Sequence, residues 1–230
     1  EGQGGTLRFG AEVERITLEG RRATGVRLAS GETLPADVVV SNADAARTYR
    51  SLLPASARRR WTDRKIDAAR HSMSLFVWYF GTRRQYPGVP HHTILLGPRY
   101  RGLLDDIFER KLLSEDHSLY LHRPTATDPS LAPAGCDAFY VLSPVPHLDS
   151  GTDWREQAEP YRAAIQRTLE RTLLPGLGAE LTTSFVMTPA DFRDRLLSYK
   201  GAAFSLEPRL LQSAWFRPHN RSEEVDRLFL

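Results

Sequence analysis

Residues 201–221 read GAAFSLEPRLLQSAWFRPHNR, a stretch in which large apolar side chains alternate with a few charged ones. Pro208 stands where a first helical residue is tolerated, and Pro218 prevents a helix from continuing. The residues at helical spacing between the two prolines are Leu210, Leu211, Ala214 and Trp215. The pattern therefore predicts a loop, a short helix and a second loop.

The composition is that of an ordinary globular chain. Its 230 residues are 41% hydrophobic and 26% charged, which is enough for one large core or for one and a half domains. The net charge is +3, and the arginines are scattered among acidic residues except at Arg58–Arg60. We therefore expect no nucleic-acid partner. Anionic lipid headgroups are the alternative use for a basic face.

Cysteine and histidine usage argues against disulfides and metals. Cys136 is the single cysteine, so no internal disulfide and no multi-cysteine zinc pattern is possible. The seven histidines contain no H-x-x-x-H, and we expect the adjacent His91 and His92 to point to opposite faces of a strand. The sequence thus predicts no metal site.

Residues 6–42 have the pattern of a β-meander, with the runs TLRFG, VERITL, ATGVRL and DVVVSN separated by turns. Three valines in succession at 38–40 indicate a strand buried on both faces, as in a parallel sheet. Asn42 could be an ordinary cap for a helix over residues 44–53.

The composition changes at Pro54. Residues 54–70 are polar and arginine-rich and predict a surface crossing into another domain. A strand at 71–81 follows, and both of its faces are apolar. One face could be simple core while the other lines a long apolar tunnel.

The rest of the chain mixes strands and helices without strict alternation. We expect strands near 92–96, 119–121, 139–145 and 183–187, and helices from Tyr100, from Pro160 and from Thr188. The predicted fold class is α/β, or α+β mixed: a mixed β-sheet covered by helices, beside part of a Rossmann-like domain that carries the antiparallel meander. No apolar run is long enough to cross a bilayer.

No reaction can be named from the residues alone, so the catalytic residues are unknown. The chain has no G-x-S-x-G and no phosphate loop, and Cys136 lies in a proline-rich loop without a neighbouring histidine. Glu207 and Arg217 invite a general acid–base role, but ten residues apart they could equally form a structural ion pair.

The string GxAFSxEPxxxQSAWFRPHN resembles a segment of bacterial phytoene desaturases, which belong to the FAD-dependent amine-oxidase-like superfamily. Residues 97–110, 118–148 and 192–205 look like further segments of the same family. The resemblance implies that the chain is a fragment, because the family's dinucleotide fingerprint and its last flavin motif are not among these residues. Residues 1–50 and 206–230 would belong to the FAD-binding domain, and 51–205 to the substrate-binding domain.

The resemblance also implies a cofactor and its contacts. FAD would lie near the backbone of Val13 and near Ser41, Asn42 and Ala43, although the same residues could be an ordinary strand valine and a helix cap. The pyrophosphate is normally held after a glycine-rich turn. Because this chain lacks G-x-G-x-x-G, we expect the fragment not to retain FAD.

Phytoene, or a related carotenoid, is the implied substrate, and successive desaturations would lead toward lycopene. A hydrocarbon of this kind is bound through apolar area. The predicted tunnel residues are Phe76, Trp78, Phe80, Phe204, Trp215 and Phe216. The implied location is cytoplasmic and peripheral to the membrane, and the oligomeric state is unknown. Another carotenoid desaturase, an oxygenating relative and a non-catalytic fragment without flavin are the alternatives.

Overall fold

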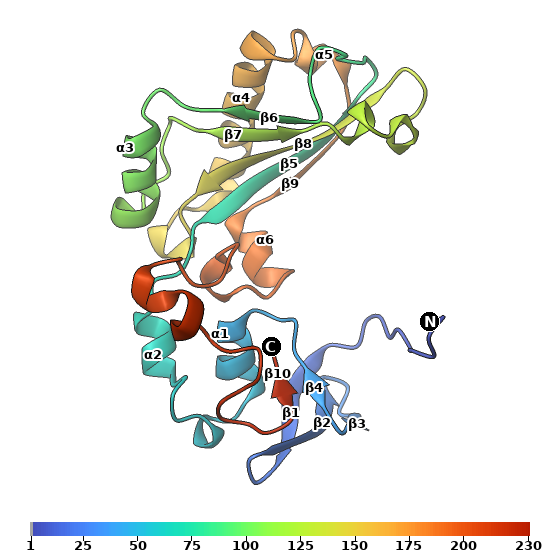
Figure 1. The fold of residues 1–230 in the computed structure, drawn as a ribbon. Coiled ribbons are helices and arrows are strands. Elements are labelled where there is room, and N and C mark those ends of the chain that lie inside the picture. Colours follow the sequence, from blue (N-terminus) through green and yellow to red (C-terminus); the bar gives the residue numbers. More distant parts are fainter. Residues whose placement is uncertain (1) are drawn as a thin grey trace. The chain divides into compact units, whose positions relative to one another are not determined.

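The computed structural model describes residues 2–230, which divide into two compact units (Figure 1). The terminal unit contains the chain up to Arg70, Leu197–Tyr199 and Ser205–Leu230, and the central unit contains His71–Leu196 and Lys200–Phe204. The first boundary therefore falls twenty residues later than the predicted one after residue 50. The arginine-rich stretch 54–70 packs with the terminal unit because Trp61 and Ile66 enter its core.

The terminal unit contains an antiparallel meander of three strands in the order β1-β2-β3. The strands are β1 (Val13–Glu19), β2 (Arg22–Leu28) and β3 (Thr33–Pro35). Ile16, Ala23 and Leu28 point into the core and are almost fully buried. Residues 6–10, which we predicted as a further strand, have no regular structure.

A second sheet joins distant parts of the sequence. Strand β4 (Val39–Val40) pairs in parallel with β10 (Leu228–Phe229), with Leu228 opposite Val39. The prediction that the valine run is buried on both faces is wrong for this chain. Val38 and Val40 are 49% and 71% exposed, because nothing among the described residues covers them.

Two short helices complete the terminal unit, α1 (Ala45–Arg47) and α2 (Asp63–Ala68). Asp44, and not Asn42, caps α1: the backbone N–H of Arg47 donates to its carboxylate at 3.0 Å. The core beneath these helices is made of buried apolar side chains from both ends of the chain: Ile16, Ala23, Val39, Ala46, Tyr49, Leu52, Leu53, Trp61, Ile66, Leu206, Val225 and Leu228.

The central unit is built on a five-stranded sheet with the order β6-β7-β8-β5-β9. The strands are β5 (Ser74–Thr82), β6 (His92–Leu95), β7 (Leu119–His122), β8 (Asp137–Val145) and β9 (Leu181–Met187). All four pairings are antiparallel, so the prediction of a mixed sheet is wrong. The strict alternation of buried and half-buried residues along β8 is the pattern of an antiparallel sheet covered on one face.

Helix α4 (Trp154–Thr172) provides that cover (Figure 1). It begins six residues before Pro160, the predicted start, because Asp153 caps it by accepting from the backbone N–H of Arg155 at 2.9 Å. Pro160 therefore lies inside the helix, where it is exposed. Tyr161, Ile165 and Leu169 lie on the face of α4 that packs onto the sheet.

Three shorter helices flank the sheet: α3 (Tyr100–Asp105), α5 (Leu177–Glu180) and α6 (Pro189–Asp194). Within residues 2–230 no helix is both long and apolar enough to cross a membrane.

A buried ion pair at Asp137 ties the loops of the central unit to its sheet. The carboxylate accepts from Arg123 Nε at 2.9 Å and Nη2 at 3.2 Å, from Thr125 Oγ1 at 2.7 Å and from the Tyr86 backbone N–H at 2.7 Å. Every acceptor position of this buried carboxylate is thus used, which is the condition for tolerating a charge in the interior.

Candidate functional site

The stretch 201–221 forms two 3₁₀ turns, Leu210–Gln212 and Ala214–Phe216, and not the predicted helix. Between them Ser213 is extended, with φ −115° and ψ 167°. Leu210 and Trp215 are 85% and 72% exposed, so these helically spaced apolar residues find no surface to pack on among residues 2–230. Without that burial, a short helix has too little to stabilise it.

Polar contacts hold residues 205–221 of this stretch in the terminal unit. Arg70 Nε donates to Glu207 Oε2 at 2.8 Å, and the amide side chain of Gln212 both accepts from and donates to the backbone of Arg70. Arg217 donates instead to the carbonyl of Leu206 at 2.7 Å. Glu207 and Arg217 therefore do not pair with each other, and each has a structural partner.

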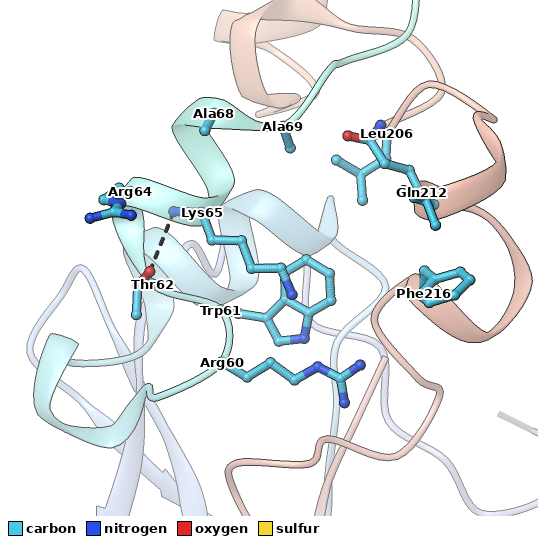
Figure 2. Close-up of a pocket in the computed structure, with 11 residues that line it drawn as sticks. Arg60, Trp61, Thr62, Arg64, Lys65, Ala68, Ala69, Leu206, Gln212 and Phe216 are labelled. Carbon is cyan, nitrogen blue, oxygen red and sulfur yellow. Dashed lines mark hydrogen bonds between the residues drawn. The ribbon is translucent and has the colours of Figure 1, made fainter.

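A pocket of about 730 Å³ lies between the stretch and helix α2 (Figure 2). Its lining combines three cationic side chains with an apolar wall: Arg60, Arg64 and Lys65 with Trp61, Ala68, Ala69, Leu206, Leu211 and Phe216, closed by Thr62 and Gln212. The Nζ of Lys65 lies 3.9 Å from the centre of the Trp61 ring, a cation–π contact. Burial lowers the pKa of Lys65, and the nearby Arg60 lowers it further.

One carboxylate fixes the floor of this pocket. Glu224 is buried and accepts hydrogen bonds from the backbone N–H groups of Arg59, Arg60 and Trp61. The indole of Trp61 stacks on Tyr49 with 5.9 Å between ring centres. The pocket is therefore built on a fixed backbone, and an amphipathic anion suits its cationic and apolar walls.

The predicted tunnel residues fall into two groups. Phe76, Trp78 and Phe80 face α4 and are 0–3% exposed, so protein side chains already cover them. Phe204, Trp215 and Phe216 are 46–72% exposed, and of these Phe216 lines the pocket. The tunnel itself stays a prediction, and the burial of the three strand residues supports the alternative that they are core.

The other face of the same sheet carries a partly exposed aromatic strip, although Leu75 and Val77 of β5 are buried on that face. Side chains from all five strands form what we call the aromatic row: Phe185 on β9, Tyr79 on β5, Tyr140 on β8, Tyr120 on β7 and His92 on β6. Consecutive ring centres along the row are 5.7–6.0 Å apart. The row offers an apolar strip across the whole width of the sheet.

Burial and a hydrogen bond favour the neutral form of the Tyr140 phenol. Tyr140 bonds to Tyr120, whose hydroxyl lies 2.7 Å from Nδ1 of His92. Burial raises the pKa of Tyr140 to about 12, and the bond to Tyr120 adds to the effect. The strip therefore presents no negative charge at neutral pH.

The predicted flavin contacts lie in the terminal unit. Val13 opens β1, the edge strand of the meander, while Ser41, Asn42 and Ala43 follow β4. Ser41 Oγ is 2.7 Å from Thr48 Oγ1, whereas Asn42 and Ala43 are exposed. The segment thus stands at the carboxyl end of a parallel strand pair, which is the edge where open α/β sheets bind ligands.

The prediction that His91 and His92 point to opposite faces of a strand is wrong. His91 precedes β6 and His92 begins it, and their ring centres are 4.3 Å apart because His91 is not yet part of the pleated strand. His122, directly opposite His92 in the antiparallel pair, joins them. One ring nitrogen from each of the three lies within 4.8 Å of the others.

The family model of flavin containing amine oxidoreductases matches residues 1–230. The chain belongs to this family. Two curated relatives are phytoene desaturases: the neurosporene-forming enzyme of Cereibacter sphaeroides is 57% identical over 100% of this chain, and the lycopene-forming enzyme of a Paracoccus species is 49% identical over 99%. The chain covers 45% and 46% of their lengths, so it spans about half of each relative.

A solved structure supports the fold. An oxidoreductase from Methanosarcina mazei superposes on 96% of this chain and 43% of its own, with a TM-score of 0.56 and 16% sequence identity. The fold is thus mixed α/β with antiparallel sheets and matches that of an oxidoreductase.

Sequence reasoning missed the aromatic row and the histidine cluster. The alternation along residues 71–81 does place Tyr79 opposite Phe76, Trp78 and Phe80. A usable signal is that three strands carry a tyrosine on this face, where the hydroxyl keeps water contact, while Phe76, Trp78 and Phe80 lie on the covered face. The histidine cluster depends on which strands are neighbours, and periodicity does not reveal that.

Proposed function

We propose that the full-length protein is an FAD-dependent phytoene desaturase, located in the cytoplasm at the membrane surface. The observation that carries the proposal is the 57% identity to a neurosporene-forming phytoene desaturase over the whole of this chain. The lycopene-forming relative is less similar, at 49%. This difference favours neurosporene, the less desaturated product, over lycopene as the main product.

The central unit would bind the substrate. A polyene has no polar group to recognise, so its binding free energy comes from buried apolar area at about 25 cal/mol per Å². The aromatic row offers such area on rigid strands, and the neutral Tyr140 places no charge against the hydrocarbon. We therefore assign the polyene surface to Tyr79, Tyr140 and Phe185 in place of Phe76, Trp78 and Phe80.

The terminal unit would contribute to flavin binding through the backbone of Val13 and the segment 41–43. The exposed Asn42 at the end of β4 and the edge position of β1 fit this role, since both leave polar groups accessible. A flavin bound there would supply the hydride acceptor for the desaturation. The residues of this chain supply binding, orientation and exclusion of water.

The test is direct. Full-length protein, FAD and phytoene in lipid vesicles are incubated, and the carotenoids are separated by chromatography and identified by their absorption spectra. Neurosporene as the main product supports the proposal in full, and lycopene supports the activity but not the preferred product. If phytoene is recovered unchanged while the protein is folded and flavin-loaded, the proposal is wrong. An oxygenated carotenoid would instead place the protein among oxygenating relatives.

A further inference from the structure

The outer edge of the central sheet gathers three imidazoles. His92 also ends the aromatic row, whereas the proposed function uses neither His91 nor His122. His91 Nε2 and His122 Nε2 lie 2.7 Å apart, and the ring centre of His92 is 5.2 Å from that of His122. All three residues come from β6, β7 and the residue before β6, which are held in register by the pairing of His92 with His122. A hydrogen-bonded sheet therefore positions the three rings.

In two of the three histidines, the partner of the outer ring nitrogen resembles that of a metal-bound histidine, whereas Nδ1 of His122 is buried without a hydrogen-bond partner. Nδ1 of His91 is hydrogen-bonded to Thr127 Oγ1, and Nδ1 of His92 lies 2.7 Å from the hydroxyl of Tyr120. Histidines that bind metals use their second nitrogen in this way, which fixes the ring and leaves the other nitrogen for the ion. A hydroxyl can accept from either ring, so it suits the tautomer that a metal requires.

Charge near the cluster does not oppose a cation. Arg123 follows His122, but its guanidinium is bound to the buried carboxylate of Asp137 and is thereby neutralised. His92 is exposed, so an ion can reach the cluster from solvent.

We propose that His91, His92 and His122 form a site for one Zn²⁺ ion, with its fourth coordination position open. Three imidazole nitrogens are a donor set suited to zinc, and sites with three protein ligands keep a position for water or another ligand. Tetrahedral coordination at about 2.0–2.1 Å places nitrogens about 3.4 Å apart. The present separations, 2.7 Å for one pair and up to 4.8 Å for the set, reach that value by small side-chain rotations. The inference does not depend on the proposed function.

The experiment uses the full-length protein, purified without a histidine tag and treated with chelator. Zn²⁺ is titrated in by calorimetry, and X-ray absorption at the zinc edge counts the imidazole ligands. We expect one equivalent of zinc with three imidazole ligands, and at least a tenfold weaker affinity in His92→Gln and in His122→Gln. His92→Gln alters an exposed side chain, and circular dichroism of each variant shows that it is folded.

The matched control is His219→Gln, which removes a partly exposed histidine of the terminal unit that pairs with Glu223. Its zinc affinity should equal that of the wild-type protein. The inference is overturned if zinc does not bind, if the three-imidazole signature is absent, or if folded His92→Gln and His122→Gln bind zinc as the wild-type protein does. An equal loss in His219→Gln also overturns it, because the zinc would then not be specific to the cluster.

Discussion

At the scale of single residues, Asp137 is a buried charge that joins three parts of the central unit. Its carboxylate is fully buried and holds Arg123, Thr125 and the Tyr86 backbone. Asp137→Ala would leave the buried guanidinium of Arg123 without its counter-charge, so we expect a loss of about 3–5 kcal/mol in the free energy of unfolding. Urea denaturation measures this. The control Asp194→Ala removes an exposed pair with Arg193 and should leave the free energy of unfolding nearly unchanged. Similar losses in both variants would contradict the prediction.

His147 gives a residue-scale prediction about pH. Burial lowers its pKa to about 4, and Lys111, Lys200 and His71 lower it further, while Asp149 opposes them. An unfolded histidine titrates near pH 6.5, so below about 6.5 the unfolded chain binds more protons than the folded one. The neutral His147 thus contributes stability that is complete above pH 6.5 and is lost as the pH falls toward 4. His147→Gln should show a smaller decrease in unfolding free energy between about pH 7 and 4, and equal pH slopes would rule the effect out.

At the scale of elements, α4 contains a proline in its interior, where proline destabilises a helix. Pro160 has no N–H to donate to the carbonyl of Glu156, and it lies on the exposed side of the helix. Pro160→Ala should raise the free energy of unfolding by about 1–3 kcal/mol. The comparison is Pro189→Ala, at the first turn of α6, where proline is favoured. For Pro189→Ala we expect the free energy of unfolding to fall by about 0.4–1 kcal/mol. Thermal unfolding measures both variants, and melting temperatures that shift in the same direction would contradict the prediction.

The two faces of β5 give an element-scale test of the polyene surface, which rests on the proposed function. In the full-length protein, Tyr79→Leu should change the ratio of partly to fully desaturated products, because it reshapes the open aromatic row. The control Phe76→Leu lies on the covered face and should cost up to about 1.5 kcal/mol without changing that ratio. Chromatography of the products and melting temperatures distinguish the two. If Phe76→Leu changes the product ratio and Tyr79→Leu does not, the polyene binds at the covered face and the assignment to the aromatic row is wrong.

Much of each element was predictable, and much of the arrangement was not. The sequence alternates along the strand 137–145, and Tyr161, Ile165 and Leu169 repeat every fourth residue along the helix. Both patterns were predictable because the spacing of apolar residues shows which face of a single element is buried. The short turns at 210–216 were predicted as a helix, since apolar spacing does not say whether a surface exists to bury it. The start of α4 was placed at Pro160 although the cap that begins the helix is Asp153. The histidine cluster was missed because it forms only when β6 and β7 are neighbours, and the sequence pattern does not give the strand order.

At the scale of the whole molecule, the question is whether the terminal unit can bind FAD without the rest of the protein. The 230 residues contain no G-x-G-x-x-G to hold a pyrophosphate at a helix N-terminus. We expect the 230-residue chain to retain little FAD through gel filtration, while the full-length protein retains about one equivalent. Absorption of the eluted protein in the flavin band measures both. A one-to-one complex with the 230-residue chain would show that Val13 and the segment 41–43 suffice.

The pairing of β4 with β10 has a consequence for the behaviour of the chain in solution. The outer edge of β4 has no neighbouring strand among the described residues, and the exposed Val38 and Val40 flank it. The outer edge of β10 is already bonded to residues 220–222. Unpaired backbone groups beside β-branched apolar side chains are a template onto which another chain can add a strand. Expressed by itself, this chain would therefore tend to aggregate edge to edge, through the same backbone groups that would otherwise extend a parallel sheet.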